Sequence, residues 1–157
     1  FVEATRPPNV PDQPKVPYGH SVASGEQTFL QLAEEGRLQS PGRYIGWTPC
    51  FRQEKFDAQH HFYFLKAEVF AWLDEMQEEQ HQLMIILDLA RQILQDETSE
   101  VVRPVPLKDG TWDLEINGVE VGSYGIRSLP MSGRRYIYGT ALAEPRFSFA
   151  LVKELRT

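Results

Sequence analysis

The segment TWDLEINGVEVGSYGIR, residues 111–127, constrains the fold most strongly, because two alternating runs flank the dipeptide Asn117-Gly118. Asn-Gly is strongly favoured in a two-residue β-hairpin turn, where both central positions need positive φ. Such a turn pairs Ile116 with Val119, Glu115 with Glu120, Leu114 with Val121 and Asp113 with Gly122. The register therefore predicts three carboxylates, Asp113, Glu115 and Glu120, on one face of the hairpin.

This acidic face has two interpretations. Opposed like charges destabilise a sheet unless solvent or a cation neutralises them. Mg²⁺ prefers carboxylate and phosphate oxygens, so Asp113 and Glu120 are candidates for a magnesium site, and Gly122 would leave room for a ligand. A solvated face remains an equal alternative, since acids on exposed strands are common.

A second hairpin is predicted over residues 42–72, where a polar tip separates an aromatic run from the alternating run HFYFLKAEVFAW. Residues Tyr63, Leu65, Ala67 and Val69 form a packing face, and Phe62, Phe64, Lys66 and Glu68 form the other. Arg52 and Glu54 share a face of the outgoing strand. An arginine offers paired donors to a phosphate, and an exposed ring offers a stacking surface to a base. The alternative is a surface ion pair, Arg52 with Glu68 or Lys66 with Glu54.

The third segment of interest is GTALAEPR, residues 139–146, in which small residues alternate along a strand that leads into a helix. A bare face at Gly139, Ala141 and Ala143 would admit the close approach of a ligand, and Arg146 at the helix start suits an anion. Tight packing of a helix on the strand explains the small residues equally well.

The remaining pattern predicts three helices and a proline-rich arm. Ser24 is a candidate N-cap and Gly36 a candidate C-terminal residue for a helix over 24–38, and residues 73–95 carry apolar side chains at helical spacing. Pro145 opens a short C-terminal helix. Residues 1–23 are expected to form an extended arm or loop. Adjacent hairpins then predict one α+β domain over residues 1–157, an antiparallel β-sheet flanked by helices.

Composition disfavours several classes of protein. The net charge is −6 and no run is dense in lysine or arginine, which disfavours a nucleic-acid-binding module. Cys50 is the single cysteine, so no internal disulfide or thiolate metal cluster is expected. His60 and His61 point in opposite directions on an extended chain, so only one of them is expected to join a site. No apolar run spans a membrane, and a cytoplasmic location is predicted.

The order and spacing of these segments resemble the catalytic core of class II aminoacyl-tRNA synthetases. Motif 2 of that family corresponds to Phe51-Arg52-Gln53-Glu54, a loop, His60, Phe64 and Glu68, and motif 3 corresponds to residues 139–146. Asp113, Glu120 and Arg127 resemble the aspartyl and asparaginyl branch, and also the asparagine synthetase A type of paralogue. The resemblance implies the class II synthetase and biotin ligase-like fold over about residues 50–151.

This resemblance implies ATP-dependent activation of an amino acid, with an acidic one favoured, through an aminoacyl-adenylate. Arg52 would hold the α-phosphate of ATP, Phe64 would stack on adenine, and His60 and Arg146 would approach the terminal phosphates. Asp113 and Glu120 would hold Mg²⁺, and Glu54, Glu68 and Arg127 would contact the amino acid. Arg52, Glu54 and Arg146 would form the catalytic set, and the family also implies a homodimer.

Departures from the family pattern keep a second reading open. Ala141 and Ala143 stand where motif 3 usually has glycines, and Pro145 replaces the usual acid, so a non-catalytic paralogue retaining the fold for binding or regulation is the alternative. Lys66 stands where the aspartyl branch tends to have glutamine. Motif 1 and an anticodon-binding domain are not evident, so tRNA, ammonia, an amine and a protein side chain all remain open as acceptors.

Overall fold

The computed structural model describes residues 23–52, 57–73 and 78–152. Six strands form one antiparallel sheet in the order β1-β2-β6-β5-β4-β3, which confirms the predicted α+β class. The predicted arm, residues 1–23, lies outside the described residues except for Ala23. In chain order the elements are α1 (Glu26–Glu34), β1 (Arg43–Phe51), β2 (Tyr63–Trp72), α2 (Glu79–Asp96), β3 (Arg103–Pro106), β4 (Trp112–Ile116), β5 (Val119–Ser128), β6 (Arg135–Ala141) and α3 (Arg146–Val152).

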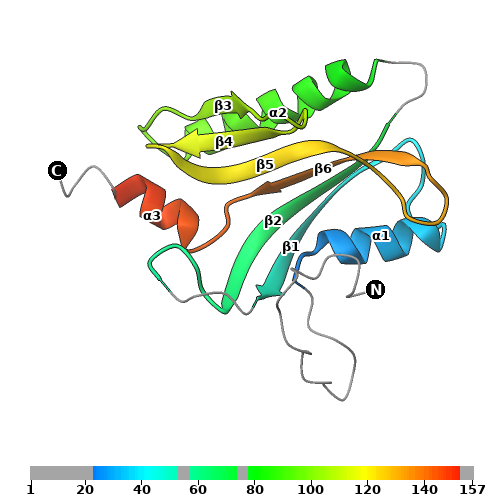
Figure 1. Ribbon diagram of the computed structural model, residues 1–157, viewed down its shortest axis with the longest axis horizontal. Coiled ribbons are helices and arrows are strands. Elements are labelled where there is room, and N and C mark those ends of the chain that lie inside the picture. Colours follow the sequence, from blue (N-terminus) through cyan, green and yellow to red (C-terminus); the bar gives the residue numbers. More distant parts are fainter. Residues whose placement is uncertain (1–22, 53–56, 74–77, 153–157) are drawn as a thin grey trace.

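The helices cover the two faces of the sheet unequally. Figure 1 shows α2 beside β3 and β4, and α1 near β1 at the opposite edge. One face packs against α2 and α3 in the larger core, which includes Leu83, Leu87, Leu114, Tyr124, Ile137 and Ala150. The other face packs against α1 in a smaller cluster around Phe70, Trp72 and Tyr136. The part of this second face beyond the α1 cluster carries polar side chains.

A side chain from the sheet fixes the start of α1. Ser24 was the predicted N-cap, but the helix begins at Glu26 with Gly25, which has no side chain, as its N-cap. The Ser24 hydroxyl accepts the Glu26 N–H at 3.4 Å, a long contact. The Glu68 carboxylate of β2 instead accepts the Gly25 N–H at 2.8 Å and the Ser24 hydroxyl at 2.7 Å. The other end follows the prediction, with Gly36 at φ +69°.

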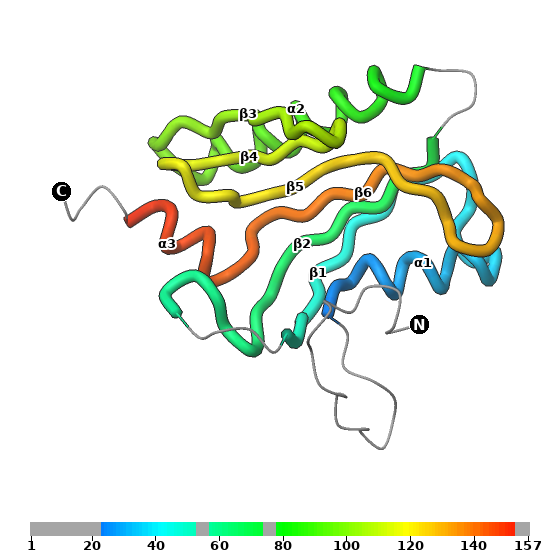
Figure 2. The backbone as a smooth tube through the Cα atoms, in the orientation of Figure 1, coloured from blue at the N-terminus to red at the C-terminus, as the bar shows by residue number. Residues whose placement is uncertain are grey.

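The turn between β5 and β6 contacts the far end of α1. The backbone N–H groups of Met131 and Ser132 donate to Glu34 Oε1 at 2.8 Å and 3.3 Å. Figure 2 shows this turn passing the C-terminal end of α1. The helix is therefore held at both ends, by β2 at its start and by the β5–β6 turn at its end.

The Asn-Gly hairpin forms as predicted at its tip and departs further out. Asn117 and Gly118 have φ of 53° and 69°, and Glu115 pairs with Glu120. A β-bulge then shifts the register, so Asp113 pairs with Ser123 and not with Gly122 as predicted. Because the bulge adds one residue to β5, the face that holds Glu120 continues with odd-numbered residues such as Ser123 and Arg127.

The space beside two glycines, which was predicted to admit a ligand, is filled by other atoms of the protein. A Cβ on Gly122 would lie 2.6 Å from the Thr140 carbonyl oxygen of the neighbouring strand. A Cβ on Gly139 would lie 2.5 Å from ring atoms of Tyr124 in the core. Close packing between neighbouring strands therefore explains both glycines. For Gly139 the alternative left open by the sequence was packing of a helix, but its neighbour is Tyr124 of β5.

Two features of the strands differ from the prediction made from the sequence pattern. β3 contains Pro104 and Pro106 and was not predicted, because proline disfavours a strand except at an edge, where it lies. On β2, Tyr63 was predicted to pack, but it is 50% exposed because the larger core does not extend to this end of the strand. Among the described helices, none has the length and apolarity needed to cross a bilayer.

Candidate active site

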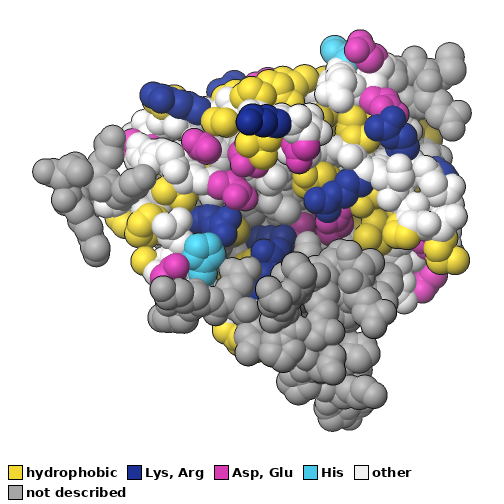
Figure 3. All heavy atoms as spheres, in the orientation of Figure 1, with side chains coloured by type: hydrophobic (Ala, Val, Ile, Leu, Met, Phe, Trp, Pro, Cys, Tyr) yellow, Lys and Arg dark blue, Asp and Glu magenta, His cyan; other side chains and the backbone are white. Residues whose placement is uncertain are grey.

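A cavity of about 640 Å³ occupies the polar part of the sheet face that carries α1. Six of the sequence-predicted residues line it: Arg52, His60, Phe64, Glu120, Arg127 and Arg146. Figure 3 shows acidic and basic side chains gathered over the middle of this face. Asp113 and Glu68 are not among the lining residues, and Glu54 lies outside the described part of the chain.

Cross-strand register brings these residues together. Thr140 of β6 lies between Glu68 of β2 and Ser123 of β5. Since side chains alternate along a strand, Phe64 and Lys66 share the face of Glu68, and Tyr136 and Tyr138 share the face of Thr140. The three central strands therefore supply the floor of the cavity, and the start of α1 supplies one wall.

Arg52 and Phe64 are in contact at one end of the cavity. The Arg52 guanidinium carbon lies 5.2 Å from the centroid of the Phe64 ring, within range of a cation–π interaction. Its Nε donates to the Ala23 carbonyl at 3.0 Å. The residue predicted to bind a phosphate thus lies beside the ring predicted to stack on a base.

Asp57 orients His60, which lines the cavity. The two carboxylate oxygens of Asp57 lie 2.9 Å and 3.0 Å from His60 Nδ1, and one of them accepts the backbone N–H groups of Gln59 and His60. The Gln59 N–H and then the His60 ring hold the pKa of Asp57 below its usual value. With Nδ1 occupied, Nε2 is the nitrogen left to meet another group. His61 lines the cavity as well, which corrects the prediction that only one histidine would do so.

Glu120 lies between a cation and a second carboxylate. Arg146 Nη1 is 3.3 Å from Glu120 Oε2. Burial raises the pKa of Glu120, the Arg146 charge opposes this rise, and the Asp113 charge adds to it. No group of three or more metal-binding side chains occurs in residues 23–52, 57–73 and 78–152. Two carboxylates nonetheless suit Mg²⁺, which usually takes its remaining ligands from water and phosphate.

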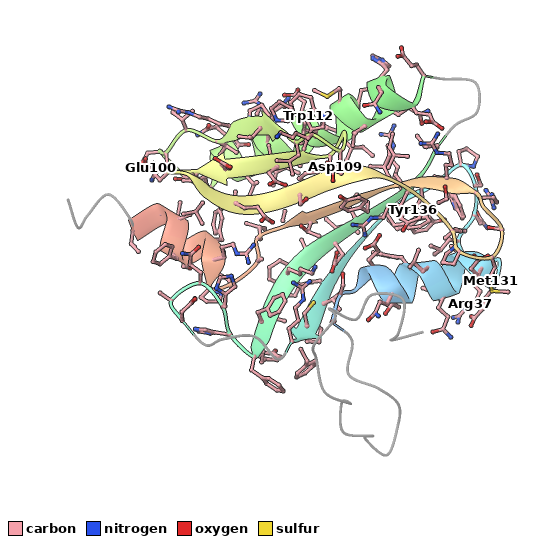
Figure 4. All side chains as sticks on the ribbon, in the orientation of Figure 1. Arg37, Glu100, Asp109, Trp112, Met131 and Tyr136 are labelled. Carbon is pink, nitrogen blue, oxygen red and sulfur yellow. The ribbon has the colours of Figure 1, made fainter. Side chains whose placement is uncertain are left out.

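Arg127 already has a carboxylate partner from α1. Its Nη1 lies 2.6 Å from Glu26 Oε2, and the Tyr136 hydroxyl donates to Glu26 Oε1 at 2.8 Å. The Arg127 guanidinium carbon is 3.8 Å from the centroid of Tyr138. Burial raises the pKa of both tyrosines. In Figure 4, Tyr136 lies where β6 passes α1.

Lys66 and Glu68 form a buried ion pair beside the cavity. They are 5% and 1% exposed, and Lys66 Nζ lies 2.9 Å from Glu68 Oε1. Lys66 also donates to the Ser24 hydroxyl at 3.3 Å. Lys66 lines the cavity and Glu68 does not. Glu68, predicted to contact a substrate, therefore supports α1 and Lys66 from behind the cavity wall.

Sequence reasoning missed Ser24, Glu26, Ser123, Tyr136, Tyr138 and Thr140, all of which line the cavity. The residues on β6 could have been predicted from the sequence, because they alternate along the strand that precedes Arg146. Those on α1 carried no local signal: Glu26 lies in an ordinary amphipathic helix and meets Arg127 from 101 positions away.

The sheet and the helices that flank it form the fold of class II aminoacyl-tRNA synthetase catalytic domains. Two similar solved structures are both of pyrrolysyl-tRNA synthetase from Desulfitobacterium hafniense. One has a TM-score of 0.62 and 18% identity, covering 85% of this chain and 49% of that one. The other has a TM-score of 0.62 and 20% identity, covering 87% and 50%.

This chain thus spans about half the length of those two structures, and at such identities the likeness shows the fold alone. No protein-family model matches the sequence, and a search of curated proteins found no match.

Proposed function

We propose that this chain uses ATP to activate an amino acid as an aminoacyl-adenylate. The observation that carries the proposal is that Arg52, His60, Phe64 and Arg146 line one cavity in a class II synthetase fold. Guanidinium groups offer paired donors to phosphate oxygens, and an aromatic ring offers a stacking surface for a base. Together these groups match the parts of a nucleoside triphosphate.

In the proposed reaction, a carboxylate oxygen of the amino acid attacks the α-phosphorus. The bond to the bridging oxygen breaks, and pyrophosphate leaves with the electron pair. Arg52 neutralises charge at the α-phosphate, and His60 and Arg146 do so at the terminal phosphates. Glu54, outside the described residues, keeps its predicted catalytic role. The protein acts by positioning and by charge neutralisation.

We propose that Asp113 and Glu120 hold Mg²⁺ together with the phosphates. When bound, the ion supplies charge neutralisation at the departing pyrophosphate. Arg146 now pairs with Glu120 at 3.3 Å, so we expect it to exchange that carboxylate for a phosphate when the nucleotide binds. Burial, followed by the Asp113 charge, raises the pKa of Glu120, and a bound cation would oppose that rise.

We propose an acidic amino acid as the substrate, as in the aspartyl and asparaginyl branch, with Arg127 as the residue that pairs with its side chain. Glu26 is the partner of Arg127 in the structure, and it would yield that cation to the substrate. Glu68 is buried behind Lys66, so its part in amino-acid binding is indirect.

We also propose that the chain acts as a cytoplasmic homodimer. Ile45 and Trp47 are 74% and 54% exposed on β1, which lies at one edge of the sheet. Large apolar side chains in a row on a strand mark a surface that gains from being covered. A second copy of the chain is the occupant we propose.

A non-catalytic paralogue is the second candidate function. Arg127, assigned to amino-acid binding, and Arg146, assigned to catalysis, are neutralised by Glu26 and Glu120. A binding or regulatory protein would keep these pairs permanently.

ATP–pyrophosphate exchange, measured with each of the twenty amino acids, separates the two candidates. We expect exchange with aspartate above the others, and we expect Arg127→Ala to abolish it for aspartate. Exchange with none of them, together with no heat of Mg·ATP binding in calorimetry, would refute the enzyme. Exchange with aspartate that survives Arg127→Ala would refute the role of that residue.

A further inference from the structure

Lys66 is a buried cation at the cavity wall, and the proposed reaction does not yet assign it a role. It is 5% exposed and lines the cavity, and it lies two residues after Phe64 on β2. Lysine is almost never buried without a partner, and here Glu68 at 2.9 Å supplies one. A buried ion pair is generally no more stabilising than well-packed apolar side chains. Stability alone therefore does not account for an ammonium in this position.

The hydrogen bonds of Lys66 leave donor capacity toward the cavity. An ammonium has three N–H groups. Glu68 Oε1 and the Ser24 hydroxyl accept two of them, at 2.9 Å and 3.3 Å. Glu68 and Ser24 are also hydrogen-bonded to each other at the start of α1, so they hold Lys66 in place from one side. Within residues 23–52, 57–73 and 78–152, Glu68 and Ser24 are the acceptors of Lys66, so its third N–H is available to an occupant of the cavity.

Arg52 is hydrogen-bonded to the same short segment, residues 23–24, that accepts a hydrogen bond from Lys66. Its Nε donates to the carbonyl of Ala23, while Lys66 donates to Ser24, the following residue. Both cations also lie near enough to Glu120 to favour its ionised form. An anion lodged between the guanidinium and the ammonium would meet donors from both, and such a position suits a group that is itself negatively charged.

We propose that Lys66 is a catalytic residue that binds the reacting carboxylate of the substrate. This inference rests on the proposed function. While one carboxylate oxygen attacks the α-phosphorus, the ammonium donates a hydrogen bond to the other oxygen, which becomes the carbonyl oxygen of the adenylate. Lys66 stays protonated throughout, and pyrophosphate departs with the electron pair of the broken P–O bond. Glu68 and Ser24 are positioning residues that fix Lys66.

The test separates this role from simple neutralisation of Glu68. Lys66→Met alone leaves a buried carboxylate without its counter-ion and is expected to destabilise the fold. The double variant Lys66→Met with Glu68→Gln removes both charges and keeps an oxygen that accepts the Gly25 N–H. Its thermal unfolding should match that of the wild type. Lys108→Met, at an exposed lysine in the β3–β4 turn, is the matched control.

Two readouts are made on the folded double variant. In ATP–pyrophosphate exchange with aspartate, kcat should fall about 100-fold, as for removal of one preorganised donor. In calorimetry, AMP should bind as to the wild type, whereas the uncleavable adenylate mimic aspartyl-sulfamoyl-adenosine should bind about tenfold more weakly. Lys108→Met should leave both readouts unchanged.

The outcomes are distinct. If the wild type shows exchange and the folded double variant retains its kcat and its affinity for the mimic, the role of Lys66 is refuted and the proposed function stands. An equal loss of AMP and mimic binding would assign Lys66 to the nucleotide and also refute the proposal. If the wild type neither exchanges pyrophosphate nor binds the mimic, the proposed function itself fails.

Discussion

Gly25→Ala tests how closely α1 is seated on the sheet. Gly25 has φ −64° and ψ −18°, a conformation that alanine adopts without strain. In open space the substitution would therefore stabilise the protein by roughly 0.4–1 kcal/mol through the unfolded state. The structure predicts the opposite sign, because a Cβ would overlap Thr48 Oγ1 and would lie 2.8 Å from Thr48 Cβ and 3.0 Å from Glu68 Cγ.

The expected magnitude follows from these two opposing terms. Since three atoms would lie within 3.0 Å, the upper half of the overpacking range applies, roughly 2–3 kcal/mol. Subtracting the gain of roughly 0.4–1 kcal/mol leaves a net loss of unfolding free energy of about 1–2.6 kcal/mol. Urea unfolding followed by tryptophan fluorescence measures it, with the slope m unchanged from the wild type. Adding Thr48→Ala removes the nearest atom and should recover part of the loss. A Gly25→Ala variant as stable as the wild type, or more stable, would refute the close seating of α1.

Four further predictions concern the core, the site and the surface. Gly139→Ala should lower the unfolding free energy by roughly 2–3 kcal/mol in urea, because its Cβ would lie 2.5 Å from Tyr124 ring atoms. The raised pKa of Glu120 means that the folded state holds this proton more tightly, so stability falls as pH rises through that pKa. Glu120→Gln should thus raise the melting temperature at neutral pH and have little effect well below the ordinary pKa of 4.5; a difference independent of pH would contradict this. His60→Gln should raise the KM for ATP and leave that for the amino acid unchanged. Trp47→Glu should shift sedimentation to the monomer.

The sequence predicted what depends on local pattern. The Asn117-Gly118 turn and the alternation on β2 were enough to place Phe64, Lys66 and Glu68 on one face, and the structure confirms that shared face. Period-2 alternation reports the direction of a side chain, but not what covers it. Hence Glu68 was assigned to a ligand, whereas its partner is the start of a helix 43 residues earlier.

Two other departures have the same physical origin. The bulge on β5 shifts Asp113 by one partner, and no residue type in the segment required it. Glu26 reaches Arg127 only after the whole sheet has formed, since 101 positions separate them in the chain. Contacts of this kind are set by strand order and helix placement, which a one-dimensional pattern does not contain.

Glu68 has two roles, because it stabilises the start of α1 and positions Lys66 for the proposed reaction. The same carboxylate oxygen accepts the Gly25 N–H that begins α1 and lies 2.9 Å from the ammonium of Lys66. Because α1 carries Glu26 to Arg127, a shift of its first turn would alter the amino-acid end of the cavity as well as the end where Lys66 lies. Glu68→Ala, which removes the oxygen that accepts the Gly25 N–H, should therefore disturb both ends together, whereas Glu68→Gln keeps that acceptor and a change at Arg127 should stay local. That asymmetry is what the arrangement of β2 and α1 predicts.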